Sequence, residues 1–510
     1  MKLRPLSELF LYRYRYILGY SLLIVVAVIL LVLNVGTLPA GLSAGEKASV
    51  LHSSSIDLSF RPETIAQDAW RFLQTTDTVN LPYHLMQKAS LAFFGLSPFG
   101  VRLPSILIAG ATAFLLFILF RRLLLPSAAG VMGVLVATSS WFLSTGRLGT
   151  PDIMIIFWAA LIFLLATLVS QEVRHHHTWK ALGIVAVGLS LYTPYTAYFY
   201  VAILVAAFTQ PHLRYVLRYT GQASITAGIF LALLILAPQG LHIWRDPSVA
   251  LELVAATHLP GPVEFLKEFV SAISNLINPF NVGFQQSPLP LIGIPTACFA
   301  LIGLVQLIRE WHSVRSHVLL VWAAILVPLI GLDSTRSLVA LFVPVMLFCA
   351  IGTQSLFKYW YTLFPRNPYA RIFGLIPLAL LMLTIVQFNY QRYFLALPFA
   401  SSTTTLYDQD AFILDKTIST KPHRDQRVLL IAPADQVTLY TVGQNTTKNL
   451  TVVPASQFTT TNNAAHIIVA ESEFARLTPA QSSLLPTAKT ELLVNDRKEN
   501  SLRFRIYSTP

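Results

Sequence analysis

Carboxylates and histidines gather in one polar stretch, residues 38–104, which directly follows an apolar segment. Its ionisable side chains include Glu46, His52, Asp57, Glu63, Asp68, Asp77 and His84. Near its middle, Ser59–Gln74 places apolar residues on one helical face and charged residues on the other. This pattern is typical of a helix that lies along a membrane interface with its apolar side down. A carboxylate-bearing loop held at a membrane surface indicates chemistry on a lipid-borne substrate.

The composition identifies the class of protein that carries this loop. Of the 510 residues, 54% are hydrophobic and only 12% are charged, whereas soluble domains carry about 25% charged residues. The chain is therefore predicted to be a polytopic α-helical membrane protein. Its formal net charge is +12, but no basic patch interleaved with aromatic residues indicates a nucleic-acid partner. Cys298 and Cys349 lie within apolar runs and offer no disulfide framework.

The apolar segments predict about 11 membrane spans. They cover approximately residues 17–33, 103–120, 129–145, 153–170, 181–193, 195–210, 221–240, 289–308, 318–332, 337–357 and 372–389. The division between the fifth and sixth is the weakest, because only Pro194 separates two apolar stretches. A cleaved signal peptide is the alternative for the first segment, since small residues follow it. The long basic region before this segment favours an uncleaved anchor.

The distribution of basic residues predicts the orientation. Turns that alternate along the chain contain Arg121, Arg122, Arg174, Lys180, Arg214, Arg218, Arg309, Arg315, Lys358, Arg366 and Arg371. Cytoplasmic loops of membrane proteins are enriched in such residues. We therefore expect a multi-pass protein of the cell (plasma) membrane with a cytoplasmic amino terminus. The three large polar segments, residues 38–104, residues 242–288 and the tail after Tyr390, then share the outer face.

The chain is predicted to contain two domains. Residues 1–399 form the transmembrane domain, with interfacial helices in the outer loops 38–104 and 242–288; the second of these helices is Gly261–Ile277. Residues 400–510 form a small extracytoplasmic α/β domain. Its predicted strands are Arg427–Ala432, Leu450–Val453, His466–Ala470, Glu491–Asn495 and Leu502–Tyr507, and its predicted helices are Ala434–Val442 and Glu471–Leu485.

A series of sequence motifs resembles one family of membrane enzymes. The motifs are GLSAGEKAS (41–49), LPYHLMQKASLAFFG (81–95), VRLPSILIAG (101–110), FRRLL (120–124), ATSSWFLSTGRLGTPDIMIIFWAAL (137–161), DSTRSLVALFVPVMLFCAIG (333–352) and NYQRYF (389–394). In this order they resemble the glycosyltransferases of the dolichyl-phosphate-mannose protein mannosyltransferase type, family 39 of the GT-C superfamily. The bacterial enzymes that transfer aminoarabinose to lipid A belong to the same group. The resemblance covers approximately the first four hundred residues.

This resemblance implies an inverting transfer of a sugar from a polyprenyl-phosphate donor to an acceptor hydroxyl on the outer face. The acceptor is a lipid, a glycan or a protein. A lipid phosphate is already a competent leaving group, so the site needs positive charge near the phosphate oxygens. It also needs a carboxylate base to remove the proton of the attacking hydroxyl. The alternative is a non-catalytic protein that binds lipid-linked sugar, or a transporter or flippase.

Three carboxylates are candidates for the catalytic role. The family has an Asp-Glu pair just after the first span, where this chain has Gly45 and Glu46. Glu46 is then the base, or Asp57 replaces it, or the activity is lost; the alternative for Glu46 is a helix-start or interfacial charge. The better match is Asp152, at the outer end of a hairpin where the family also has an acidic residue. Its alternative role is to cap a helix that begins there.

The donor-binding candidates are two arginines and their polar neighbours. Arg336 resembles the outer arginine of the family and has Asp333 nearby, although a cation at a span end can also be a snorkelling interface residue. Arg147 is expected to pair with Asp152 or to approach the donor phosphate, and His84 to reach the site. The charges that the lipid A enzymes carry at the positions of Asn80–Tyr83 are missing, so lipid A is not an implied acceptor. A divalent cation between Glu46 or Asp57 and Asp152 stays open.

Overall fold

The computed structural model describes residues 10–58, 64–171, 176–218, 222–257, 260–277, 292–364, 368–397, 407–419, 427–444, 450–458, 464–486, 490–494 and 502–508. The chain divides into two compact units. The first contains residues 1–33, 60–82 and 105–397, and the second contains residues 34–59, 83–104 and 398–510. This division differs from the predicted boundary at residue 399, because two pieces of the first outer segment share an apolar core with the tail.

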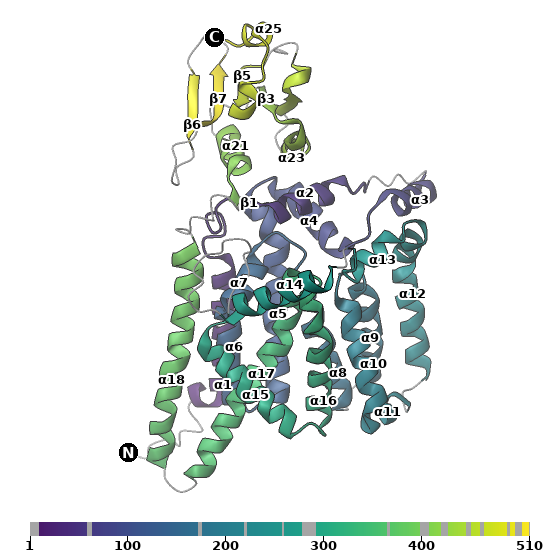
Figure 1. Ribbon diagram of the computed structural model, residues 1–510, viewed down its shortest axis with the longest axis vertical. Coiled ribbons are helices and arrows are strands. Elements are labelled where there is room, and N and C mark those ends of the chain that lie inside the picture. Colours follow the sequence, from purple (N-terminus) through teal and green to yellow (C-terminus); the bar gives the residue numbers. More distant parts are fainter. Residues whose placement is uncertain are drawn as a thin grey trace. The chain divides into compact units, whose positions relative to one another are not determined.

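The first unit is a helical bundle, and a helix lies in each of the eleven predicted apolar segments. These helices are α1 (Phe10–Val32), α5 (Pro98–Leu123, whose first turns belong to the second unit), the pair α6 (Pro126–Thr138) and α7 (Ser140–Arg147), α8 (Ile153–Ser170), α9 (His176–Ser190), α10 (Thr196–Thr209), α12 (Gln222–Arg245), α15 (Ile294–Arg309), α16 (Val314–Leu326), α17 (Ser334–Leu363) and α18 (Pro368–Tyr390). Figure 1 shows α8, α10, α16 and α17 side by side. The short α11 (Pro211–Arg218) follows α10.

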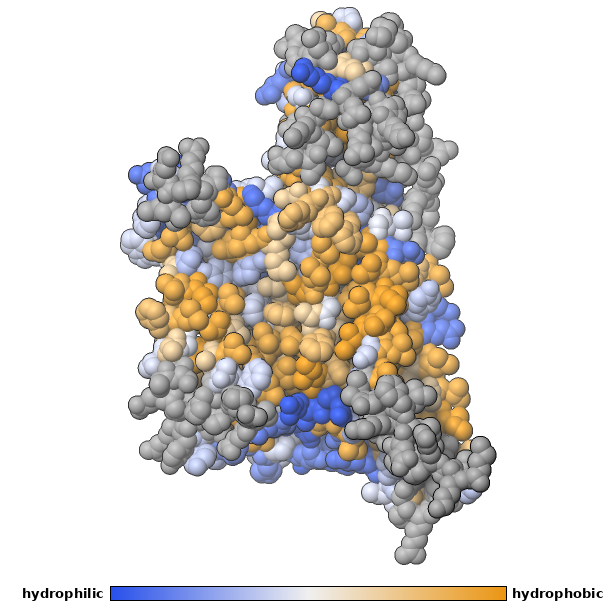
Figure 2. Space-filling view, turned by 180° about the vertical axis from the view of Figure 1, so that it is seen from behind, coloured by the Kyte–Doolittle hydropathy of each residue, from blue (hydrophilic) through white to orange (hydrophobic). Residues whose placement is uncertain are grey.

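Length and composition mark six helices of the described chain as able to cross a membrane, or seven if α6 and α7 together form one span. Four further apolar helices are shorter, namely Leu18–Val32, Thr178–Ser190, Thr196–Thr209 and Ile294–Arg309. The number of eleven spans therefore stays a prediction. Hydrophobic side chains cover much of the visible face of this bundle in Figure 2, and Phe230 of α12 is 71% exposed. Such a surface is suited to lipid rather than water.

Two interruptions of the apolar segments matter for the site. The predicted span 129–145 is not one helix, because α6 and α7 meet at Ser139 with a bend of 52°. Ser139 has an extended ψ of 123° and its hydroxyl accepts a hydrogen bond from Phe142 N, so it ends one helix and caps the next. The predicted break at Pro194 is confirmed, since α9 ends at Ser190 and α10 begins at Thr196.

Both helices predicted at the membrane interface are present as helices. They are α3 (Ile65–Thr75), whose predicted first residues 59–63 lie outside the described chain, and α14 (Pro262–Ile277); the short α13 (Ser248–Leu253) precedes α14. Figure 1 shows α14 across the direction of the long helices. Its Leu266 and Val270 are exposed, and its Phe265 contacts Gly331 at the end of the 3-10 turn η2 (Pro328–Gly331). The predicted apolar stripe of α14 thus packs only in part. The rest of the second outer segment, residues 278–288, lies outside the described residues.

The second unit joins the first outer segment to the tail. Helix α2 (Ala44–Ser55) and most of α4 (Leu81–Phe94) belong to it, and strand β1 (Leu42–Ser43) pairs antiparallel with β2 (Tyr407–Asp408). A five-stranded sheet follows in the order β4-β3-β5-β7-β6, with β4, β3 and β5 parallel and the other pairings antiparallel. The strands are β3 (Val428–Ala432), β4 (Leu450–Pro454), β5 (His466–Ala470), β6 (Thr490–Val494) and β7 (Leu502–Ser508).

All five strands predicted for the tail are confirmed, as is the helix after Pro433, which is α23 (Ala434–Gln444). Helix α21 (Asp410–Ser419) precedes β3. The predicted helix Glu471–Leu485 is wrong, because only the short pieces α24 (Glu471–Phe474) and α25 (Pro479–Ser482) form. Pro479 disfavours a helical conformation at Thr478, whose ψ is 157° and whose hydroxyl caps α25 instead.

Strand β3 is buried on both faces, which explains its continuous apolar sequence. Leu429 and Ile431 pack into one cluster, with side chains from β5 and the segment after β4. Val428, Leu430 and Ala432 pack into the other, which also holds Leu42 and Val50 from the first outer segment. The sheet therefore buries one face against residues that precede it in the chain by several hundred positions.

Candidate active site

Asp152 lies in the short connection between α7 and α8. Its carboxylate accepts a hydrogen bond of 3.0 Å from the hydroxyl of Thr150. The backbone carbonyl of Thr150 in turn accepts a hydrogen bond from Ser105 Oγ on α5. Within the described chain the Asp152 side chain makes no capping hydrogen bond to α8. The alternative role predicted for Asp152 was to cap α8 with its side chain, and no contact of this kind is observed.

Arg336 and Asp333 lie at the start of α17 and act on Asp152 through their charges. Asp333 begins that helix, because its Oδ1 accepts a hydrogen bond of 3.1 Å from the backbone N–H of Arg336. Burial raises the pKa of Asp152, the Arg336 charge and the Thr150 hydroxyl oppose this rise, and Asp333 adds to it. Three of the predicted site residues are therefore brought together in the first unit: Asp152, Asp333 and Arg336.

Tyr195 completes this cluster, and no motif in the sequence predicts a role for it. Its hydroxyl donates to the backbone carbonyl of Asp333 at 3.4 Å and accepts from Ser337 Oγ at 3.1 Å. Burial and the charge of Asp333 raise the pKa of the phenol, so the hydroxyl stays neutral. The signal that could have located it is Pro194, which interrupts two apolar stretches immediately before this tyrosine.

Arg147 makes different contacts from those predicted. Its guanidinium donates to the backbone carbonyls of Leu30 and Leu33 at the carboxyl end of α1. It also lies 5.1 Å from the ring centroids of both Tyr393 and Phe394. These contacts are those of a helix cap held between aromatic rings. A role in donor binding stays a prediction for Arg147.

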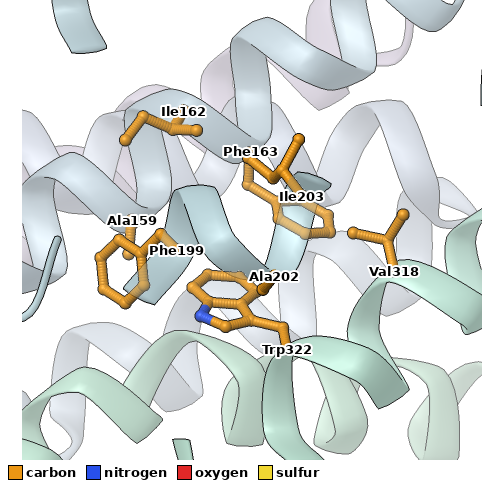
Figure 3. Close-up of a pocket in the computed structure, with 8 residues that line it drawn as sticks. All are labelled: Ala159, Ile162, Phe163, Phe199, Ala202, Ile203, Val318 and Trp322. Atoms are coloured by element: carbon orange, nitrogen blue, oxygen red, sulfur yellow. The ribbon is translucent and has the colours of Figure 1, made fainter. Parts of the chain in front are cut away.

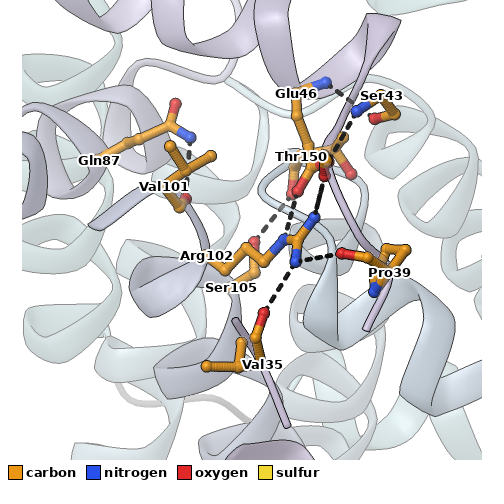
Figure 4. Close-up of polar contacts among 10 residues, drawn as sticks. Val35, Pro39, Ser43, Glu46, Gln87, Val101, Arg102, Ser105 and Thr150 are labelled. Carbon is orange, nitrogen blue, oxygen red and sulfur yellow. Dashed lines mark hydrogen bonds and ion pairs between the residues drawn. The ribbon is translucent and has the colours of Figure 1, made fainter. Parts of the chain in front are cut away.

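Glu46 and Arg102 form a buried ion pair in the second unit, and both side chains are 0% exposed. Arg102 Nε donates to Glu46 Oε1 at 2.8 Å, and Glu46 Oε2 accepts from the backbone N–H of Ser43 in a capping box at the start of α2. The other donors of the guanidinium reach the carbonyls of Val35, Pro39 and Gly41 and the second oxygen of Glu46 (Figure 4). All five N–H groups of Arg102 are thus used. A role of Glu46 as the base would require its oxygens to leave these partners.

Asp57 and His84 also belong to the second unit. Asp57 is exposed, and its charge partly offsets the effect of burial on the pKa of Lys88. His84 is buried, its Nδ1 lies 2.9 Å from Ser53 Oγ, and its ring stacks on that of His52 with 4.0 Å between centroids. Burial, followed by the neighbouring His52, lowers the pKa of His84 to about 3. The catalytic role of Asp57 and the donor-binding role of His84 stay predictions.

The pKa of His84 predicts how stability depends on pH. In the unfolded chain a histidine binds its proton near pH 6.5, whereas in the folded protein it does so near pH 3. Between these values the unfolded state holds more protons, so the stability contributed by neutral His84 is present above pH 6.5 and is lost as the pH falls towards 3. The thermal midpoint in detergent, measured from pH 7.5 to 4.5, should decline less steeply for His84→Asn than for the wild type. His317→Asn, which removes a ring that contacts Thr209 at the protein surface, serves as the control for the loss of an imidazole. An unchanged slope in His84→Asn would contradict the prediction.

A cavity of about 10 Å³ between α8, α10 and α16 is lined by apolar side chains such as Phe163, Phe199 and Trp322 (Figure 3). It provides no group for acid–base chemistry. No cluster of three or more His, Cys, Asp or Glu side chains suited to a metal ion occurs in the part of the chain that the structure describes. The divalent cation between Glu46 or Asp57 and Asp152 stays a prediction.

Comparison with known proteins relates part of the sequence to a family and the fold to a solved structure. Residues 81–242 match the dolichyl-phosphate-mannose-protein mannosyltransferase family. The structure is similar to that of ArnT from Cupriavidus metallidurans bound to undecaprenyl phosphate, with a TM-score of 0.57 and 12% identity, covering 96% of this chain and 97% of that chain. The apo state of the same protein gives a TM-score of 0.55 and 13% identity, covering 97% and 98% of the two chains. No curated protein matches the chain in sequence.

The fold is therefore like that of ArnT, and six of the described helices are long and apolar enough to cross a membrane, or seven if α6 and α7 form one span. Residues 81–242 are thus similar to the dolichyl-phosphate-mannose-protein mannosyltransferase family, and the chain as a whole is similar in fold to ArnT. The resemblance predicted from the sequence motifs is confirmed.

Proposed function

We propose that this protein is an inverting glycosyltransferase that moves a sugar from a polyprenyl-phosphate donor to an acceptor hydroxyl. The observation that carries the proposal is the environment of Asp152. Its carboxyl has a raised pKa, faces the charge of Arg336 and makes no capping bond to the helix that follows it. A carboxyl whose pKa is raised by burial and that faces a cation is typical of a functional group.

The reaction assigns each group one task. The acceptor oxygen attacks the anomeric carbon, the bond from that carbon to the phosphate oxygen breaks, and polyprenyl phosphate leaves with the bonding electron pair. Asp152 takes the proton of the acceptor hydroxyl, and its raised pKa makes it a stronger base than an ordinary aspartate. Arg336 offers charge and directed N–H groups to the phosphate oxygens, where negative charge grows as the bond breaks.

Two further observations support the choice of donor. The ArnT relative was solved with undecaprenyl phosphate, a polyprenyl phosphate of the predicted kind. The basic turns of this chain favour a cytoplasmic amino terminus, which puts the connection that carries Asp152 on the outer face. We therefore propose the outer face of the membrane as the place of transfer, with Arg336 as the main donor-binding residue. Glu46 and Asp57 remain the alternative bases.

The Arg336→Ala variant tests donor binding. It should bind undecaprenyl phosphate in detergent about 10- to 100-fold more weakly than the wild type, as expected for the loss of a hydrogen bond to a charged group. Arg315→Ala is the matched control, because that arginine pairs with Glu310 at an exposed turn between α15 and α16.

The same proteins are then assayed in vesicles for sugar transfer from a lipid extract of the source membranes. Equal affinity in both variants would contradict the role of Arg336. Binding by the wild type without any transfer would instead favour the non-catalytic lipid-linked-sugar binder.

A further inference from the structure

Tyr195 has a backbone conformation that tyrosine rarely adopts. Its φ is 69°, in the left-handed region, and it immediately precedes α10. A bulky residue keeps this conformation only where the surrounding contacts require it. Its backbone N–H donates to the carbonyl of Leu253 at 3.0 Å, and its side chain is completely buried. The turn between α9 and α10 therefore directs the phenol inward in one fixed orientation.

The phenol reaches the first turn of α17. Ser337, which is also completely buried, donates to the Tyr195 hydroxyl and reaches the carbonyl of Leu329 at 2.8 Å. The Tyr195 hydroxyl donates to the carbonyl of Asp333. These contacts connect three segments, the turn before α10, the turn η2 and the start of α17. Tyr195 contacts Asp333, which immediately precedes α17, and Ser337, which lies in its first turn. Arg336 lies between these two residues in the chain.

We propose that Tyr195 is a positioning residue that holds the start of α17 so that Arg336 and Asp333 face Asp152 in a fixed geometry. This inference rests on the proposed function, because it assigns Tyr195 an effect on the site through Arg336. The charged groups that face the phenol are Asp333 and Arg336. Since the phenol stays neutral, it acts as a hydrogen-bond donor rather than as a charge.

The experiment compares two tyrosines at the start of α10, Tyr195 immediately before the helix and Tyr198 in its first turn. Tyr195→Phe removes the hydroxyl that contacts α17, whereas Tyr198→Phe removes a hydroxyl that donates to the backbone carbonyl of Val254 at 2.8 Å. Each variant loses one hydrogen bond to a backbone carbonyl, and Tyr195→Phe also removes the acceptor of Ser337, so it should lose at least as much thermal stability as Tyr198→Phe. Only Tyr195→Phe should lower sugar transfer, by roughly 3- to 10-fold, the size expected for one neutral hydrogen bond.

A pH profile separates positioning from a general loss of structure. Arg336 lowers the pKa of Asp152, so a displaced Arg336 lets that pKa rise. The acid limb of the transfer rate should then move to higher pH in Tyr195→Phe and stay in place in Tyr198→Phe. Ser337→Ala should have a similar effect, and the double variant should be no worse than the stronger single variant, because both changes remove one shared contact.

The outcomes distinguish this inference from the proposed function. If the wild type transfers sugar and Arg336→Ala does not, but Tyr195→Phe has the rate and acid limb of Tyr198→Phe, the positioning role is wrong and the function stands. If the wild type transfers no sugar, binding of undecaprenyl phosphate still decides the matter. Tyr195→Phe should then weaken that binding relative to Tyr198→Phe, and equal binding would overturn the inference.

Discussion

Asp152→Asn should lower the rate of sugar transfer by about 10²- to 10⁴-fold, the usual contribution of a general base. Asparagine keeps the size of the side chain and an oxygen that accepts the hydrogen bond from Thr150, but it cannot take the proton. Thermal stability should therefore change little. The measurement is the initial rate of transfer in vesicles, with the extracted lipid donors at saturation.

A matched control for Asp152→Asn is Asp246→Asn. The Asp246 carboxylate accepts from Ser248 in an exposed turn before α13, so it also carries a local hydrogen bond at the end of a helix. This control should transfer sugar at the wild-type rate. If Asp152→Asn were as active as the control, Asp152 could not be the base, and Glu46 and Asp57 would be the next residues to change.

The wild-type rate of sugar transfer should rise with pH through an acid limb that lies above the usual range of an aspartate, because burial raises the pKa of Asp152 and the base must be ionised.

Glu46→Ala should destabilise the second unit by about 3–5 kcal/mol, since it leaves the buried guanidinium of Arg102 without its carboxylate. Arg102→Lys should also destabilise it, because an ammonium group has three donors where the guanidinium uses five. Lys47→Met is the control, as its ion pair with Asp408 is partly exposed and is expected to contribute only about 1 kcal/mol or less. Thermal unfolding of the purified full-length protein measures all three.

Glu46→Gln separates the two roles of this residue. The amide oxygen still accepts from Ser43 in the capping box, so the helix start is preserved while the proton acceptor is removed. If Glu46 has only a structural role, the rate of sugar transfer should fall in proportion to the loss of thermal stability in Glu46→Ala, Glu46→Gln and Arg102→Lys. If Glu46→Gln lost transfer while it kept the stability of the wild type, Glu46 rather than Asp152 would be the base.

Much of this architecture could be predicted from the sequence, because its elements have strong local signals. Apolar segments as long as Ile153–Ser170 leave few alternatives to a buried helix, and the strands of the tail are short runs such as VLLIA that lie between turns. Asp152 and Arg336 were each predicted as site residues through resemblance to a family, but the partner expected for Asp152 was Arg147. Their meeting depends on how α8 and α17 pack, which the local pattern of neither segment encodes.

The parts that could not be predicted are those decided by long-range partners. Glu46 is a candidate base because it matches the Asp-Glu pair of the family, but its buried ion pair with Arg102, 56 positions later in the chain, was not predicted. Arg102 itself lies in the motif VRLPSILIAG (101–110), which contributed to the family resemblance without a predicted role for this arginine. Tyr195 looked like an ordinary aromatic residue in a span, since its left-handed backbone and its contact with Asp333 are invisible in the sequence.

The pairing of β1 with β2 has a consequence for how the chain is synthesised. Leu42 and Val50 leave the ribosome early, yet the cluster in which they pack also needs Leu430, Ile468 and Phe504, which are made last. Such distant contacts form slowly, and apolar surface that waits for its partner is prone to aggregation. The membrane helices in between must be inserted while this early piece remains incomplete. A truncation within the tail would thus disrupt a region near the opposite end of the protein.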